Sequence, residues 1–246
     1  MLEWMGYTWM NGQPWGIAHP NKDQQWYADP DETKILSDGS LCLSLNNKEK
    51  YIGGDVNQTK KFGCGVITTN EAFLYGHFKF RYILPKGIHL WPGIWLSGVD
   101  SWPPEIDIME GWSGNGFFCK GKPNYKKFIG FNRIHPGIYY GRDGEKALGK
   151  GYGSLGTDDV TYEWYQNTNG KQNTCELYWQ PDHITAYYNE YKVMDITEEV
   201  YLKGLRARMS VRLDLFAGNN MTQKDYNDYK KNGTPFIINE FTYKPL

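Results

Sequence analysis

Hydrophobic and polar residues alternate with a period of two along many short stretches of the chain, which is the pattern of half-buried β-strands. The clearest stretch runs from Phe73 to Leu84, where large apolar residues share one face and basic residues share the other. Further strands are expected at 41–45, 63–69, 93–97, 104–111, 128–134, 160–165, 174–179, 184–188, 206–215 and 236–243. Helical patterns are confined to 197–202 and 222–231. Short strands with turn-rich connections predict an all-β sandwich of two antiparallel sheets.

No linker, repeat or low-complexity tract divides the chain, so residues 1–246 are expected to form a single domain. Residues 1–35 are rich in Trp, Gly, Pro, Asn and Asp. They are expected to form irregular loops at an edge of the sandwich, with Trp15 and Trp26 as candidate plugs or sugar platforms.

Three carboxylates interrupt an otherwise apolar strand at 104–111, namely Glu105, Asp107 and Glu110. Burying several anions together is unfavourable, because each loses water and repels the others, so such a cluster indicates a site. Glu105 and Asp107 share a face of an extended strand, whereas Glu110 has the opposite parity. A β-bulge at Ile108-Met109 would return Glu110 to that face. The alternatives are a strand facing solvent and a calcium site, although the Asn/Gly turns of a calcium loop are missing.

With the bulge, the two glutamate Cα atoms are about four strand steps, or roughly 13 Å, apart. Side chains that lean inward bring the carboxyls to about 6 Å, close to the separation found in retaining glycosidases. One carboxylate then attacks a sugar carbon, the other carries the proton for the leaving oxygen, and Asp107 lies between them. The three acids are therefore candidate catalytic residues.

The motif Glu105-Ile-Asp107-Ile-Met-Glu110 resembles the bulged E-x-D-x-x-E signature of glycoside hydrolase family 16. The resemblance extends over about 64–189, through the segments 73–78, 84–87, 90–96, 134–137 and 176–189. It implies a concave β-jelly roll and retaining endo-hydrolysis of a β-linked polysaccharide. By position in the family motif, the resemblance implies that Glu105 is the nucleophile, Glu110 is the acid/base and Asp107 assists them.

The polysaccharide is less defined than the reaction. A β-1,3- or mixed β-1,3/1,4-glucan is the first expectation. A sulfated galactan such as agar, porphyran or carrageenan is an alternative, supported by the basic run 120–127, and a bacterial exopolysaccharide is another, since Trp102-Pro-Pro104 is not the usual laminarinase lead-in. Transglycosylation shares the same chemistry. A carbohydrate-binding jelly roll without catalysis is the alternative of another class, and the intact acids argue against it.

Further residues are expected to bind sugar. Flat aromatic faces stack on sugar rings, and Trp91, Trp95, Trp102 and Trp112 lie near the acids in the sequence. Polar candidates stand on the strand expected beside the acidic one. They are Asn132, Arg133 and His135.

Charge and composition limit the kinds of binding partner that we expect. A formal net charge of -1 gives no reason to expect nucleic acid, and no apolar stretch is long enough to cross a bilayer. No signal peptide is visible, yet a polysaccharide is too large to enter a cell, so we expect an extracellular monomer. The cysteines are Cys42, Cys64, Cys119 and Cys175, and both disulfides and buried thiols are compatible with them. No cofactor is expected; Asn239 replaces an Asp usual in the family, which argues against its structural calcium.

Overall fold

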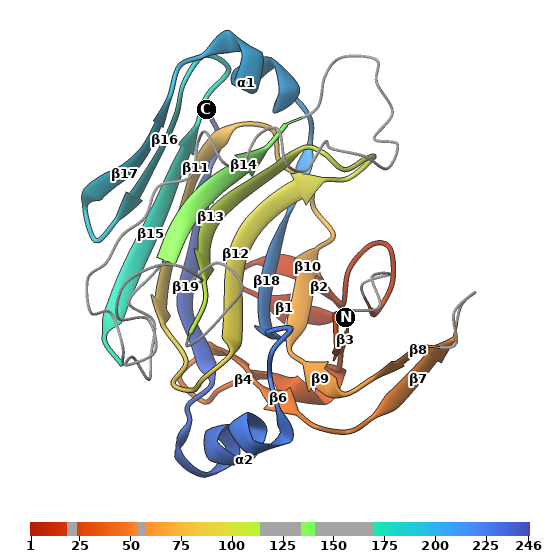
Figure 1. The fold of residues 1–246 in the computed structure, drawn as a ribbon. Helices are drawn as coiled ribbons and strands as arrows, with labels where there is room; N and C mark the ends of the chain where they lie inside the picture. The colour runs from red at the N-terminus through yellow and green to blue at the C-terminus, as the bar shows by residue number, and fades with distance from the viewer. Residues whose placement is uncertain (19–23, 54–57, 114–133, 141–169) are drawn as a thin grey trace.

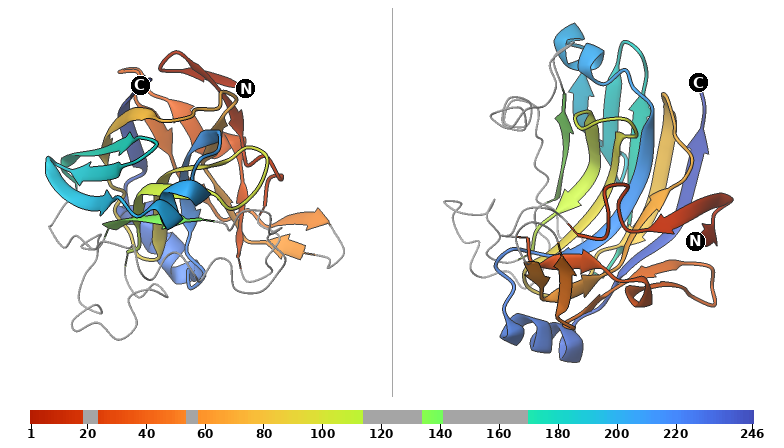
Figure 2. Two further views of the ribbon diagram at one scale, coloured as in Figure 1. Left: turned by 90° about the horizontal axis from the view of Figure 1, so that it is seen from above. Right: turned by 90° about the vertical axis from the view of Figure 1, so that its right-hand side faces the viewer.

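The computed structural model describes residues 1–18, 24–53, 58–113, 134–140 and 170–246. Two antiparallel sheets dominate this part of the chain and lie face to face as curved layers (Figure 1, Figure 2). The first has the order β1 (Leu2–Trp4), β2 (Tyr7–Asn11), β10 (Val66–Thr69), β18 (Met209–Ala217), β12 (Leu90–Gly98), β13 (Glu105–Gly111) and β14 (Ile134–Tyr139). The second has the order β17 (Tyr191–Ile196), β16 (Ile184–Tyr188), β15 (Gln172–Trp179), β11 (Gly76–Ile83), β19 (Phe236–Lys244), β5 (Leu41–Leu43) and β4 (Thr33–Ile35). The predicted all-β sandwich is confirmed.

Smaller elements complete the described chain. A three-stranded sheet contains β3 (Trp26–Ala28), β9 (Phe62–Cys64) and β6 (Leu45–Asn46), and a separate ribbon pairs β7 (Lys50–Gly53) with β8 (Gln58–Lys60). The helices α1 (Glu199–Gly204) and α2 (Gln223–Asn232) lie at opposite ends of the sandwich (Figure 1), and a 3₁₀ turn covers Pro30–Glu32. Helix α2 begins after Thr222, which forms a capping box with Asp225.

The core lies between the two large sheets. Alternate residues of each strand point inward, such as Leu96 on β12, Val211 on β18 and Phe80 on β11, and all three are fully buried. The hydroxyl of Tyr188, on β16, donates a 2.8 Å hydrogen bond to the carbonyl of Ile108, on β13, and so ties the sheets together. Because the inward positions are apolar, the other face of the first sheet is left for polar side chains.

The structure corrects the expectation that residues 1–35 are irregular. The described part of this segment contains β1 to β4, and the turn between β1 and β2 has positive φ at Met5 and Gly6. Trp4 and Trp9 are buried in the core. The many glycines, prolines and asparagines therefore mark tight turns between short strands rather than a long loop.

Two further differences concern sheet edges. Strand β17 was not expected; it follows a tight turn in which Asn189 and Glu190 both have positive φ. Strand β14 continues to Tyr139 although it contains Pro136. It is the edge strand of its sheet, where a missing backbone donor is tolerated. The strand expected at 160–165, and most of that expected at 128–134, lie outside the described residues.

The described cysteines Cys42, Cys64 and Cys175 are all free thiols, and Cys119 lies outside the described residues. In the described chain, neither helix has the length and hydropathy that crossing a bilayer requires.

Candidate active site

The bulge predicted in β13 is present. Opposite β12, Asp107 pairs with Trp95 and Met109 pairs with Ile94, so Ile108 is the extra residue. The same irregularity separates Asp107 from Glu110 in the pairing with β14. Ile108 and Met109 are both buried in the core, and Glu110 returns to the face that carries the other two acids.

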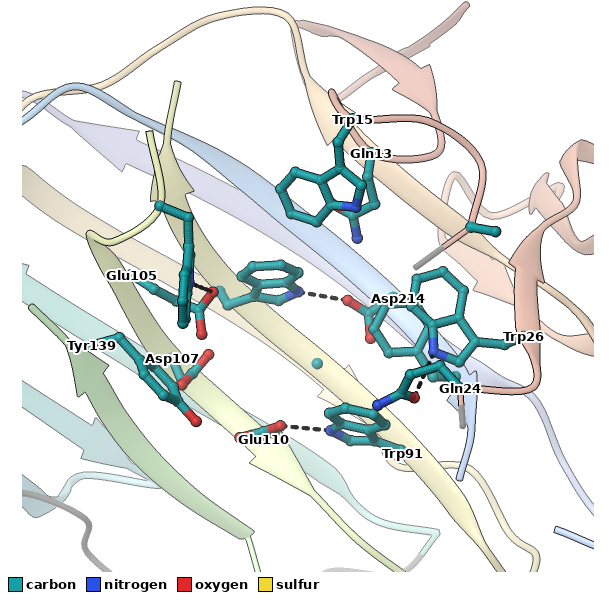
Figure 3. A pocket seen from close by; sticks show the side chains of 15 residues that line it. Gln13, Trp15, Gln24, Trp26, Trp91, Glu105, Asp107, Glu110, Tyr139 and Asp214 are labelled. Carbon is teal, nitrogen blue, oxygen red and sulfur yellow. Dashed lines mark hydrogen bonds between the residues drawn. The ribbon is translucent and has the colours of Figure 1, made fainter. Parts of the chain in front are cut away.

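All three acids line one pocket of about 790 Å³ on the face of the first sheet that points away from the core (Figure 3). A fourth carboxylate, Asp214 on β18, lines it as well. The pocket is otherwise largely aromatic, with walls formed by Trp15, Trp26, Trp91, Trp95, Trp102, Tyr139 and Phe216. Trp15 and Trp102 are 46% and 40% exposed, so the pocket opens to solvent between indole rings.

Each of three indole N–H groups donates a hydrogen bond to one carboxylate of the pocket. Trp102 donates to Oε2 of Glu105 at 3.0 Å, and Trp91 donates to Oε1 of Glu110 at 2.6 Å. Trp95 donates to Oδ2 of Asp214 at 2.6 Å (Figure 3). These bonds fix the orientation of the carboxylates, while the indole faces remain part of the pocket wall.

The pocket environment raises the pKa of every one of these carboxyls. Loss of water raises the pKa of Glu105 to about 7, although the Trp102 hydrogen bond and the charge of Arg212 oppose the rise. Loss of water and, to a lesser extent, the charge of Glu105 raise the pKa of Glu110 to about 8, against the Trp91 hydrogen bond. Burial, and then repulsion by the neighbouring acids, raises the pKa of Asp107 well above its usual range. At neutral pH the group therefore holds both ionised and protonated carboxyls.

The raised pKa values of these carboxyls predict that the stability of the fold depends on pH. The pKa values of Glu105 and Glu110, about 7 and about 8 in the folded protein, exceed the ordinary value of 4.5. Between pH 4.5 and 8 the folded state thus binds more protons than the unfolded state, and the free energy of unfolding falls as the pH rises. We expect Glu110→Gln to melt within about 1 °C of wild type at pH 4.5 but at least about 2 °C higher at pH 9. Thermal melts across this range test it, and a constant difference between the two proteins would contradict it.

The expected aromatic residues divide into two groups. Trp91, Trp95 and Trp102 line the pocket, and so do Trp15 and Trp26. Trp112 does not: it is buried and its ring stacks on Trp91 at a centroid distance of 6.0 Å. Strand β13 ends at Gly111, so the alternation that placed Trp112 beside Glu110 no longer applies there. Trp112 therefore packs against Trp91, a residue of the pocket wall, and is not itself one of the lining residues.

The polar candidates are described only in part. Asn132 and Arg133 lie outside the described residues, as does the basic run 120–127. The backbone of His135 pairs with Glu110 across β13 and β14, while its side chain lies outside the described atoms. Among the described residues, no group of His, Cys, Asp or Glu is arranged to hold a metal ion.

Sequence reasoning missed the contribution of β18. Asp214 pairs with Gly93, which pairs in turn with Glu110, so one cross-strand row joins the two carboxylates. A Cβ atom at Gly93 would lie 2.9 Å from Oδ1 of Asp214, so glycine keeps this part of the pocket open. In the sequence, polar residues alternate along 206–214 and so share one face of the expected strand. Only the strand order shows that this face lies on the same side of the sheet as the acids.

No family model matches the chain. It is 37% identical over 103 residues to a glucan endo-1,3-beta-glucosidase of Cryptopygus antarcticus, a match that covers 39% of the chain and 36% of that relative. The chain thus spans about a third of that curated relative. Its fold matches the LamAcat structure from Zobellia galactanivorans, with a TM-score of 0.67, 16% identity and coverage of 96% and 90% of the two chains. It also matches SCLam, a non-specific endo-beta-1,3(4)-glucanase from family GH16, with a TM-score of 0.66, 15% identity and coverage of 96% and 83%.

The chain therefore has the β-jelly-roll fold of the laminarinases. SCLam, which shares this fold, comes from family GH16, the family that the acidic motif and the segments around it resemble.

Proposed function

We propose that the chain is a retaining endo-β-glycanase that acts on β-1,3- or mixed β-1,3/1,4-glucan. One observation carries the proposal: the bulge in β13 brings Glu105, Asp107 and Glu110 to one side of an aromatic-lined pocket that opens to solvent. The relative from Cryptopygus antarcticus and the SCLam structure, named as acting on β-1,3- and β-1,3(4)-glucans, support the substrate class.

In this proposal the pair of glutamates divides the chemistry. An oxygen of ionised Glu105 forms a bond to the anomeric carbon as the bond from that carbon to the leaving oxygen breaks. Glu110, whose pKa of about 8 keeps it protonated at neutral pH, gives its proton to the leaving oxygen. The resulting ester has removed the charge of Glu105, so Glu110 becomes a base that takes a proton from water. Water then attacks the same carbon and releases Glu105. Asp107, between them on the same face, orients the nucleophile.

The pocket favours a neutral sugar. Four carboxylates line it, and none of the described lining residues is a lysine or an arginine. An anionic sulfate or carboxylate group would be repelled there. Indole faces such as those of Trp15 and Trp102 suit the flat apolar faces of glucose rings. Because such a polymer is too large to enter a cell, the proposal includes action outside it.

Incubation with laminarin, barley β-glucan, agarose, porphyran and carrageenan tests the function. We expect laminarin or barley β-glucan to be cut to a ladder of oligosaccharides, with the galactans left intact. Proton NMR at early times should show the new reducing ends as β-anomers. Exclusive release of small sugars from chain ends, cleavage of a galactan alone, or a first product with the α-configuration would each contradict part of the proposal.

A further inference from the structure

Arg212 is a fully buried cation on the same face of the first sheet as the acids. It pairs with Trp95 across β18 and β12, and Trp95 pairs with Asp107 across β12 and β13. Arg212 thus lies two strand spacings, or about 10 Å between backbones, from the acidic strand. Its guanidinium contacts the rings of Trp15 and Trp95, and both of these residues line the pocket that holds the acids.

Two indole rings enclose the guanidinium. Its central carbon lies 4.3 Å from the ring centroid of Trp15 and 4.7 Å from that of Trp95. None of its three nitrogen atoms has a hydrogen-bond partner among the described residues. Burial without hydrogen bonds is costly for a charged group, and cation–π contacts offset only part of that cost. An apolar side chain would fill the space more favourably, so the charge itself calls for an explanation.

The charge of Arg212 acts unequally on the acids. Burial lowers the pKa of the guanidinium to about 10, and the carboxylates of Glu105 and then Asp214 counteract that fall, so it stays protonated at working pH. Arg212 lowers the pKa of Glu105, whereas the charge that acts on Glu110 is that of Glu105, which raises its pKa. The other titratable groups facing Glu105 are Asp107 and Glu110 on its own strand, Asp214 on β18 and the Tyr139 phenol on β14.

We propose that Arg212 is a positioning residue that makes Glu105, and not Glu110, the ionised member of the glutamate pair. The inference rests on the proposed glycanase function and deepens it, because it explains which of two similar carboxyls becomes the nucleophile. Trp95 supports the arrangement twice, since its face contacts the guanidinium and its N–H holds Asp214.

The test compares Arg212→Met, which keeps bulk and removes charge, with Arg212→Lys, which keeps charge and loses the planar stack. Carboxyl carbons of ¹³C-labelled glutamate are followed by NMR titration without substrate, and the Glu105 signal is assigned by its loss in Glu105→Gln. An opposite charge at short range lowers a carboxyl pKa by about 1–3 units. We therefore expect the Glu105 titration in Arg212→Met to move up by about one unit or more, and that in Arg212→Lys to stay within about half a unit of wild type.

Activity gives the second readout. The acidic limb of the pH profile of kcat/KM should move upward in Arg212→Met by the same amount, with a loss of about tenfold at pH 6. An unmoved Glu105 titration with a lower melting temperature would overturn the inference and leave a packing role, as would equal shifts in the Met and Lys variants. If Arg212→Met does not fold, Arg212→Lys is measured alone. A rise of about one unit or more in its Glu105 titration, as expected for loss of the charge, would then overturn the inference. Absence of hydrolysis by wild type would refute the proposed function alone, because the NMR titration needs no turnover.

Discussion

Glu105→Gln is expected to abolish turnover of laminarin and barley β-glucan, with a loss of kcat of at least about 10⁴-fold. The amide has nearly the same shape and keeps an oxygen that accepts the Trp102 hydrogen bond. It has no negative charge with which to form the glycosyl ester. Initial rates of reducing-end release, measured beside thermal melts, check the prediction.

The fold should survive this change, because burial already disfavours the ionised Glu105 carboxylate. The melting temperature at pH 8 is expected to equal or exceed that of wild type. Glu176→Gln is the matched control: this carboxylate lies on β15 of the other sheet, paired with Lys79 and His77, and its loss should leave activity within about twofold. Activity of Glu105→Gln above about 1% of wild type would refute the nucleophile role.

A smaller side chain gives an independent view of the same role. In Glu105→Ala the space beside the anomeric carbon is open, and azide can attack from the side the carboxylate has left. We expect azide to restore cleavage of an activated aryl β-glucoside oligomer and to yield a glycosyl azide of inverted, α, configuration. A β-configured azide would mean that another carboxylate still forms the ester in this variant.

The acidic strand was predictable because its information is local. In this strand the isoleucine and methionine residues should be buried on one face, and the three acids should share the other face. Only one extra residue in the strand allows both arrangements. The pairing of Asp107 with Trp95 and of Met109 with Ile94 shows that residue to be Ile108. The strand itself therefore carried enough constraint to predict its own irregularity.

The contribution of β18 was not predictable in the same way. Arg212 and Asp214 lie more than 100 residues after the acids and meet them only because β18 pairs with β12, which pairs with β13. The local sequence pattern does not indicate which strands pair at long range. It shows only that polar residues alternate along the strand, and a strand that faces solvent has the same alternation. The N-terminal strands were not predicted for another reason. Strands β1 to β4 are three to five residues long, which is too short for an alternating pattern to stand out among the surrounding turn residues.

The third acid has a prediction that distinguishes proton donation from structural support. Glu110→Gln removes the proton that the leaving oxygen needs, while Glu105 remains able to attack. Hydrolysis of natural glucan should fall by about 10²–10⁴-fold. Oligosaccharides with a dinitrophenyl leaving group need no protonation, so their first step should stay within about tenfold of wild type and produce a burst of phenol.

The pH dependence sharpens the distinction. In wild type, activity is expected to fall above the pKa of Glu110, about 8, because the proton donor ionises there. In Glu110→Gln that alkaline limb should disappear for the dinitrophenyl substrate, whereas the acidic limb set by Glu105 should remain. Glu176→Gln again serves as the control with both limbs in place. Equal losses on glucan and on the activated substrate, or an alkaline limb that persists in Glu110→Gln, would show that Glu110 shapes the pocket and that the proton comes from another group, with Asp107 the nearest carboxyl on the same strand face.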